Sequence, residues 1–257
     1  MTTPPRVTLL SDFGMADGYV AAMKGVIASA SPAVIIDDAA HDVEPGDILG
    51  AALTLERYWR RYPEGTVHVV VVDPGVGSAR RAVAVRADER YLVGPDNGVF
   101  SRVLAGATRT EAREITNAEL WSQGLSATFH GRDVFAPAAA FLASGRALAE
   151  LGQHAADLVT LPSLHVIVSE DTLTGEVIHA DRFGNLITSI GTEAVGAGRV
   201  VLEGVDIGPV RGTYSEVGTG EPVALIGSNG LLEIAVRDGS AAKRFGYRRG
   251  VRVEVRR

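Results

Sequence analysis

Residues 69–81, which read VVVVDPGVGSARR, constrain the fold of this chain more than any other stretch. Four consecutive valines are typical of a short strand that is buried on both faces of a sheet. The run ends at Asp73, Pro74 and Gly75, where proline fixes φ and glycine permits backbone that a side chain forbids. Ligands of open α/β sheets bind beyond the carboxyl ends of the strands. This polar loop is therefore a candidate site, and a plain turn carrying a solvated arginine pair is the alternative.

Strand and helix patterns alternate through the first half of the chain. Short apolar runs typical of strands flank the valine run at 7–10, 34–36, 82–85 and 91–93, and the last two resemble a hairpin. Helical spacing of apolar residues occurs at 18–30 and 47–60, and an alanine-rich helix ends near residue 144. This alternation predicts an α/β domain with a mostly parallel sheet flanked by helices.

The pattern changes in the last third of the chain. Short apolar runs separated by glycines recur there at 177–180, 186–190, 200–202, 223–226, 231–236 and 251–255. Such spacing predicts a smaller all-β, barrel-like domain. We therefore expect an N-terminal α/β domain over 1–160, a linker over 161–172 and a C-terminal β-barrel domain over 173–257.

Composition excludes several classes of function. The net charge of −6 argues against the phosphate-neutralising surface of a nucleic-acid-binding protein. The chain has no cysteine, which excludes disulfides and thiolate catalysis. No apolar run reaches the roughly 18 residues that a membrane span needs, and no signal peptide precedes the first strand. We therefore expect a cytoplasmic protein with no nucleic-acid or membrane partner.

Common catalytic motifs are missing from the sequence. The GxGxxG, P-loop, HExxH and GxSxG patterns are absent, and the six histidines do not cluster at metal-ligand spacing. Acids do follow several predicted strands, at Asp12, Asp37, Asp38 and Asp73. Because carboxylates are ligands for magnesium, a magnesium-dependent phosphohydrolase remains an alternative.

Two further residues are candidates with two interpretations each. Asp12 follows the first strand, where a carboxylate can accept hydrogen bonds from a ribose diol or can cap the next helix. His130 precedes the alanine-rich helix, near the positive end of the helix dipole. It is either a functional group or a structural histidine with its hydrogen bonds satisfied.

Six motifs in a fixed order carry a family resemblance. They are Ser11 to Gly14, Asp73 to Gly77 with Arg80 and Arg81, Gly94 to Gly98, Thr128 to Pro137, Asp181 to Asn185, and Ser228 to Gly230. Together they resemble the S-adenosylmethionine (SAM) hydroxide adenosyltransferases, relatives of the SAM-dependent fluorinase and chlorinase. The resemblance spans nearly the whole chain. It implies an N-terminal α/β domain followed by a small β-barrel.

The resemblance also implies an activity. It predicts an enzyme that hydrolyses SAM to adenosine and L-methionine when water or hydroxide attacks the ribose C5′. SAM is the substrate, and no cofactor or metal is implied. The family forms homotrimers, with SAM between the N-terminal domain of one subunit and the C-terminal domain of the next. A SAM- or adenosine-binding protein without turnover is a further alternative.

The resemblance assigns roles around the attacking water. Asp73, Arg80 and His130 match the catalytic side chains of the hydroxide-transferring members. The fluorinase has a threonine where Val76 stands and a serine where Gly131 stands, both near the halide, although glycine at the second place also occurs in the chlorinase. Neither hydroxyl exists in this chain, so water is the expected nucleophile.

Seven residues are implied to bind the substrate: Asp12, Asn97, Phe129, Asp181, Asn185, Ser228 and Asp238. By resemblance, Asp12 holds the ribose hydroxyls. Asp181 and Ser228 hold the amino and carboxylate end of methionine. Asn185 and the backbone around Asp238 contact adenine.

Overall fold

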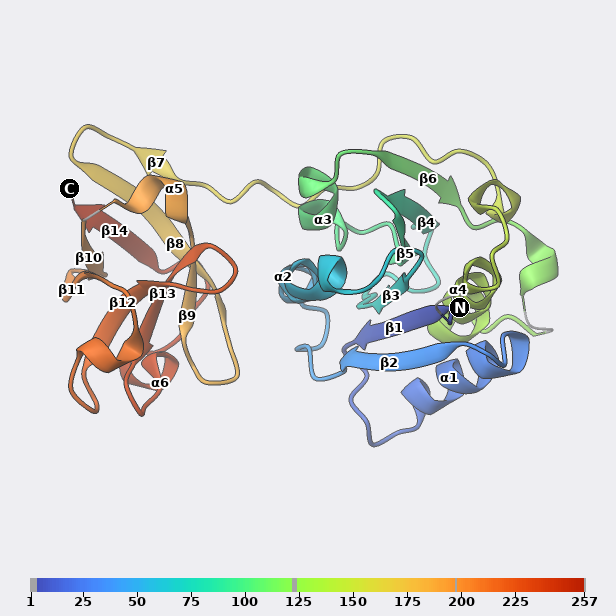
Figure 1. The fold of residues 1–257 in the computed structure, drawn as a ribbon, viewed down its shortest axis with the longest axis horizontal. Helices are drawn as coiled ribbons and strands as arrows, with labels where there is room; N and C mark the ends of the chain where they lie inside the picture. Colours follow the sequence, from blue (N-terminus) through green and yellow to red (C-terminus); the bar gives the residue numbers. More distant parts are fainter. Residues whose placement is uncertain (1–3, 122–123, 197, 257) are drawn as a thin grey trace. The chain divides into compact units, whose positions relative to one another are not determined.

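The computed structural model describes residues 4–121, 124–196 and 198–256, and its fold class is the predicted one. The chain forms two compact units, 1–161 and 162–257. The first is an α/β unit and the second is built almost entirely of strands (Figure 1).

A six-stranded sheet forms the centre of the N-terminal unit. Its strands are β1 (Arg6–Ser11), β2 (Ile35–Ala40), β3 (Val67–Val71), β4 (Ala82–Ala87), β5 (Arg90–Pro95) and β6 (Thr110–Glu114), in the order β2-β1-β3-β5-β4-β6. Strands β2, β1, β3 and β5 run parallel, whereas β4 is antiparallel to both of its neighbours. The mostly parallel sheet and the hairpin of β4 and β5 are thus confirmed.

Helices cover both faces of this sheet. They are α1 (Tyr19–Ala30), α2 (Ile48–Tyr58), α3 (Ser101–Gly106) and α4 (Ala136–Ala143), with short helical turns at Trp59–Arg61, Ala118–Leu120 and Leu148–Leu151 and a π-helical turn at Gly131–Phe135. In the described part of the chain, none of the helices combines the length and apolar character that crossing a bilayer demands.

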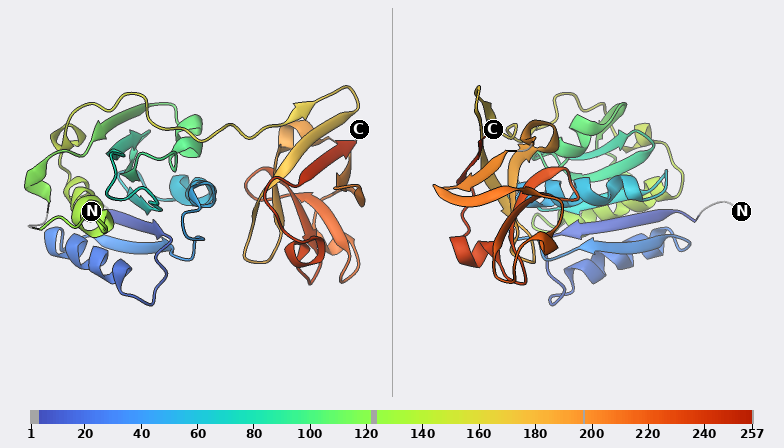
Figure 2. Two further views of the ribbon diagram at one scale, coloured as in Figure 1. Left: turned by 180° about the vertical axis from the view of Figure 1, so that it is seen from behind. Right: turned by 60° about the vertical axis from the view of Figure 1, so that its left-hand side comes forward.

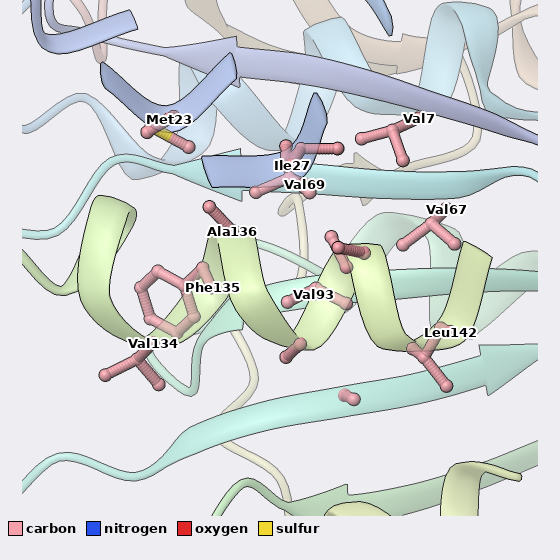
Figure 3. Close-up of a cluster of buried hydrophobic side chains, with 14 of the residues drawn as sticks. Val7, Met23, Ile27, Val67, Val69, Val93, Val134, Phe135, Ala136 and Leu142 are labelled. Atoms are coloured by element: carbon pink, nitrogen blue, oxygen red, sulfur yellow. The ribbon is translucent and has the colours of Figure 1, made fainter. Parts of the chain in front are cut away.

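The valines of β3 supply both cores because successive strand residues face opposite sides of a sheet. Val67 and Val69 pack with Met23 of α1 and with Phe135 in one buried cluster, shown in Figure 3. Val70 belongs to the second cluster, which contains residues of α2 and α3. The valine run is therefore buried on both faces, as predicted.

The strand order places two loops side by side. Because β1 lies between β2 and β3, the chain crosses to opposite faces of the sheet on either side of β1. Ser11 at the end of β1 pairs with Val71 at the end of β3, so the loops that begin with Asp12 and Asp73 are neighbours. Such a switch point is where open α/β sheets bind ligands.

The second strand is longer than its apolar run. We predicted a strand at 34–36 that ends before Asp37 and Asp38, but β2 continues through Ala40. As an edge strand it leaves these carboxylates free to pair, Asp37 with Arg6 and Asp38 with Lys24. Acids are tolerated in a strand whose outer side carries no partner.

The C-terminal unit is a closed barrel of seven strands. The ring runs β14 (Arg252–Arg256), β10 (Arg199–Leu202), β11 (Val205–Arg211), β12 (Pro222–Ile226), β13 (Leu231–Val236), β9 (Leu186–Gly191) and β8 (Thr172–Ala180), and β8 pairs back to β14. A two-residue strand, β7 (Ile167–Val168), also pairs with β8, and two short helices are α5 (Thr192–Val195) and α6 (Ala241–Phe245). Figure 2 shows these strands from two further directions. The predicted barrel is confirmed.

Candidate active site

Asp73, Arg80 and His130 form one hydrogen-bonded group. Arg80 Nε lies 3.0 Å from each carboxylate oxygen of Asp73, and Arg80 Nη2 lies 2.5 Å from Oδ2. The same Nη2 lies 2.7 Å from Nδ1 of His130. The side chains of Asp73 and Arg80 are only 5% and 10% exposed. The structure therefore brings together the three residues predicted to surround the attacking water.

The loop after β3 holds Arg80 above Asp73 through its own turns. The N–H of Val76 donates to the carbonyl of Asp73 at 3.2 Å, and the hydroxyl of Ser78 accepts from the N–H of Arg80 at 3.3 Å. Gly77 has a φ of +77°, and a Cβ built there lies 2.5 Å from the carbonyl oxygen of Ala127. Only glycine satisfies both the left-handed backbone and this close approach. The loop thus packs tightly on the segment that leads to His130.

A buried carboxylate shapes that segment. Asp133, which is 1% exposed, accepts a hydrogen bond from the backbone N–H of Ser126 at 2.8 Å and pairs with Arg132 at 2.6 Å. It lies in the π-helical turn that follows His130. π-Turns are rare and frequently occur at functional sites. We predicted only that this segment leads into the alanine-rich helix, because apolar spacing does not reveal the extra residue of a π-turn.

The charge state of His130 follows from its neighbours. Burial lowers the pKa of His130, and the positive charge of Arg80 lowers it further against the opposing effect of Asp73. Since a guanidinium only donates, Nδ1 of His130 must accept, and Nε2 carries the ring proton. In the part of the chain described, nothing accepts from Arg80 Nη1. Arg80 and His130 therefore retain N–H donors for another acceptor.

Asp12 faces the loop after β2 and does not cap a helix. Its Oδ2 accepts from the backbone N–H of Gly46 at 2.8 Å, whereas no described residue donates to Oδ1. The N-cap of α1 is Gly18, with no side-chain cap, so the helix-cap interpretation of Asp12 is wrong. A Cβ on Gly46 lies 3.9 Å from Cβ of Pro74, which joins this loop to the one that carries Asp73.

An aromatic cluster lies beside these loops. The ring centroids of Phe13 and Phe129 are 5.8 Å apart, and Tyr19 lies 5.6 Å from Phe13 and 5.2 Å from Phe129. Tyr19 is 48% exposed, so the cluster reaches the surface. We predicted Phe129 as a binding residue, which stays a prediction, and did not predict its contacts with Phe13 and Tyr19. The sequence signal for these contacts was that Phe13 and Tyr19 both lie in the segment that follows Asp12 and leaves the end of β1.

Asn97 is engaged with the backbone. Its amide donates to the carbonyl of Val72 at 2.8 Å, and its side-chain oxygen accepts from the N–H of Val99 at 3.2 Å. These bonds tie the turn after β5 to the end of β3. The structure shows this positioning contact, and substrate binding by Asn97 stays a prediction.

In the C-terminal unit, Asp181 and Asn185 form one turn. Asp181 Oδ1 accepts from the N–H groups of Phe183 and Asn185 at 2.9 and 2.8 Å, and Oδ2 lies 3.1 Å from the Asn185 amide nitrogen. A Cβ on Gly184 falls 2.0 Å from the hydroxyl oxygen of Ser240. This turn therefore packs against the start of α6.

The other predicted C-terminal residues flank β13. Ser228 lies in the turn before this strand, whereas Asp238 follows it with a φ of +54°. Leu186, next to Asn185, pairs with Ile234 near the end of β13. By this register, Asn185 and Asp238 follow one end of β13 and Ser228 precedes the other.

The acids that suggested magnesium do not converge. Asp37 pairs with Arg6, Asp38 with Lys24, and Asp73 with Arg80. Over the described ranges, no group of three or more histidine, aspartate or glutamate side chains is placed to hold a metal ion. Three of the four carboxylates behind the phosphohydrolase alternative are thus held in separate ion pairs, and the fourth, Asp12, accepts from the backbone of Gly46.

Comparisons with known proteins agree over the whole chain. Models of the SAM hydroxide adenosyltransferase N-terminal and C-terminal domains match residues 7–152 and 175–254. A protein of Thermus thermophilus named (R)-S-adenosyl-L-methionine hydrolase is 45% identical over 97% of this chain and 98% of its own. A fluorinase of Actinopolyspora mzabensis is 29% identical over 98% of this chain and 97% of its own. The crystal structure of an uncharacterized conserved protein from Thermotoga maritima matches with a TM-score of 0.90 and 34% identity, covering 98% of this chain and 100% of that one.

Proposed function

The chain belongs to the SAM hydroxide adenosyltransferase family, and we propose that it hydrolyses SAM to adenosine and L-methionine with Asp73, Arg80 and His130 as its catalytic group. The observation that carries this proposal is the bridging guanidinium of Arg80, held by Asp73 on one side and His130 on the other. Its one positive charge is fixed by two neighbours in a largely buried place, which suits a site for an anionic oxygen.

The reaction is a displacement at the ribose C5′. The hydroxide oxygen forms a bond to C5′ while the C5′–S bond breaks. The electron pair of the breaking C5′–S bond stays on sulfur. The products are adenosine and methionine as a neutral thioether, so the leaving group needs no general acid. If water attacks, one proton is released as well. Sulfonium and hydroxide charges cancel in the transition state, which a site shielded from water favours.

Hydroxide fits this site better than a water that must be deprotonated there. Both carboxylate oxygens of Asp73 and the unprotonated ring nitrogen of His130, Nδ1, already accept from Arg80. The donors left over, on Arg80 and on His130 Nε2, stabilise an acceptor with negative charge. We therefore assign Arg80 to bind the nucleophile, and Asp73 and His130 to orient Arg80.

Substrate binding follows the other predicted residues. The free Oδ1 of Asp12 is suited to accept from a ribose hydroxyl, since Gly46 occupies only Oδ2. Asn185 is assigned to adenine, and Asp181 and Ser228 to the methionine end. Because the family match covers both units, we propose a homotrimer. In it, Asp181, Asn185 and Ser228 of one subunit complete the site of a neighbouring subunit.

Mixed oligomers test that assembly. Arg80→Ala subunits mixed with Asp181→Ala subunits should regain turnover that neither variant has alone, because some sites then combine two intact halves. Each variant reassembled with itself is the control. A fully active monomer in light scattering during turnover would refute the assembly.

Product analysis tests the activity itself. The protein is incubated with each sulfonium diastereomer of SAM, because the Thermus relative is named for the R form. We expect adenosine and methionine in equal amounts, unchanged by a metal chelator, since we propose that no cofactor takes part. Binding of SAM without consumption would favour the non-catalytic alternative, and loss of turnover with chelator would favour the metal-dependent one. A cytoplasmic location stays a prediction.

A further inference from the structure

A second chain of polar side chains lies behind Asp12. The hydroxyl of Ser11 is 2.7 Å from Nδ1 of His41, and Nε2 of His41 is 3.0 Å from Oδ1 of Asp38. The other carboxylate oxygen of Asp38 accepts from Lys24 at 2.5 Å. These residues come from β1, the loop after β2, β2 itself and α1. No step of the proposed mechanism uses them.

The direction of each bond in this chain follows from chemistry. A carboxylate only accepts, so Nε2 of His41 carries a proton that faces Asp38. When that is the only proton on the ring, Nδ1 accepts from the Ser11 hydroxyl. Ser11 Oγ in turn accepts from the N–H of Phe13 at 3.4 Å. Ser11 is 1% and His41 6% exposed. A serine so buried cannot attack a substrate, which leaves a positioning role for the chain.

Backbone hydrogen bonds also join His41 to the loop after β1, which carries Asp12. The carbonyl of His41 accepts from the N–H of Gly14 at 2.7 Å, and the N–H of Gly46 donates to Asp12 at 2.8 Å. The loop after β1 is thus tied to the loop after β2 on both sides of Asp12. His41 provides two of these ties, one through its ring and one through its carbonyl.

We propose that His41 is a positioning residue that, with Ser11 and Asp38, sets the Asp12 carboxylate for the 2′,3′-diol of the ribose. The inference rests on the proposed function, which assigns Asp12 to that diol. Loss of the ring removes the tie at Ser11, so the Asp12 loop samples other positions and the hydrogen bonds to the diol weaken. Contacts of the ligand with adenine do not depend on this loop.

Calorimetry with two nucleosides separates these effects. Adenosine carries the diol, whereas 2′,3′-dideoxyadenosine lacks it. We expect His41→Ala to weaken adenosine binding about tenfold, the scale of one hydrogen bond to a charged group, and to leave 2′,3′-dideoxyadenosine binding unchanged. Ser11→Ala, a smaller change, should act in the same direction. Arg146→Ala, which removes an exposed ion pair with Glu150, is the control and should alter neither affinity.

Coupling to Asp12 is the second measurement. If His41 acts through Asp12, His41→Ala should have no further effect in an Asp12→Ala background. His41→Asn, whose side-chain oxygen can accept from Ser11, should recover most of the affinity. Equal losses for both nucleosides, or full additivity with Asp12→Ala, would overturn the positioning role. A wild-type protein that binds both nucleosides equally would instead refute the assignment of Asp12 to the diol.

Discussion

Nη2 of Arg80 lies 2.7 Å from Nδ1 of His130, and this contact fixes which groups at the site can donate. A guanidinium cannot accept, so Nδ1 of His130 carries no proton and the proton of the neutral ring is on Nε2. The ring then acts as a support for Arg80 and not as a base while the contact holds. The first two predictions follow from this relationship.

Arg80→Lys should lower the turnover number about 100- to 1000-fold while the dissociation constant for SAM changes less than about threefold. Lysine keeps the charge but cannot bridge Asp73 and His130 with a planar fork, and loss of one preorganised charge-stabilising donor has this size. Single-turnover release of adenosine, together with calorimetry, separates the two constants. Arg146→Ala should match wild type in both. A variant that bound SAM weakly but turned it over normally would place Arg80 in substrate binding instead.

The pH dependence of kcat should show an acid limb below the usual histidine range. His130 supports Arg80 only as a neutral ring, and burial together with the positive charge of Arg80 lowers its pKa below the usual histidine value of 6.5. Activity is therefore retained as the pH falls through 6.5 and is lost at lower pH, where Nδ1 becomes protonated. In His130→Asn the amide oxygen still accepts but does not titrate, so this limb should disappear. A limb centred above 6.5, or one that persists in His130→Asn, would contradict the assignment.

Local signals account for what the sequence predicted well. The valine run, the break at Asp73 and the spacing of apolar residues depend on near neighbours, and they were enough for the sheet and the barrel. Asp73, Arg80 and His130 were grouped only by the family resemblance, and their catalytic role stays a prediction. The bonds of His41 to Ser11 and Asp38 join residues from separate elements. Such contacts depend on the register between β1 and β2, which one sequence does not specify.

Strand ends and irregular strands were less predictable. β2 extends through Asp37 and Asp38 because an edge strand tolerates acids, and β11 was missed because Gly208 and Pro209 interrupt its apolar pattern. Both glycine and proline weaken a strand prediction, although they are accepted where a strand bends or pairs irregularly. Here the ladder of β10 and β11 shifts its register between Val200 and Val201.

Gly77→Ala should destabilise the N-terminal unit by about 2–4 kcal/mol. Its φ of +77° strains any side chain, and the added Cβ lies 2.5 Å from the carbonyl oxygen of Ala127. Gly25→Ala is the matched control, because it lies within α1 with nothing inside 4 Å of the new Cβ. That change should stabilise by about 0.5–1 kcal/mol. Urea unfolding measures both, and equal effects would refute the steric argument.

The free energy of unfolding should fall in acid because of His68, a buried histidine that has no part in the proposed mechanism. Burial, and to a smaller extent the charge of Arg90, lowers the pKa of His68 to about 3. The unfolded chain binds a proton near pH 6.5 and the folded chain does not, so stability present above pH 6.5 is lost as the pH falls toward 3. The slope is about 1.4 kcal/mol per pH unit.

Urea titrations between pH 7.5 and 5 measure that loss. His68→Phe removes the titrating group among the surrounding tyrosine rings and should flatten the slope over this range, whatever its effect on absolute stability. His154→Gln, at an exposed histidine, should leave the slope as in wild type. An unchanged slope in His68→Phe would mean that other groups carry the acid sensitivity.

Water should be the acceptor of the adenosyl group, and fluoride and chloride should be poor substrates. Halide capture requires donors that replace its hydration shell, and the chain has Val76 and Gly131 where the fluorinase carries hydroxyl groups. The space at Gly131 is also filled: a Cβ there lies 3.2 Å from Met23 Sδ and 3.3 Å from carbon atoms of Phe13 and Phe129. Turnover in oxygen-18 water should therefore place the label on the 5′ oxygen of adenosine. Gly131→Ser should slow hydrolysis without creating halogenation, since the serine must displace these rings. Chloride yielding mainly 5′-chloro-5′-deoxyadenosine in the wild-type protein at neutral pH would show that the site selects the nucleophile in another way.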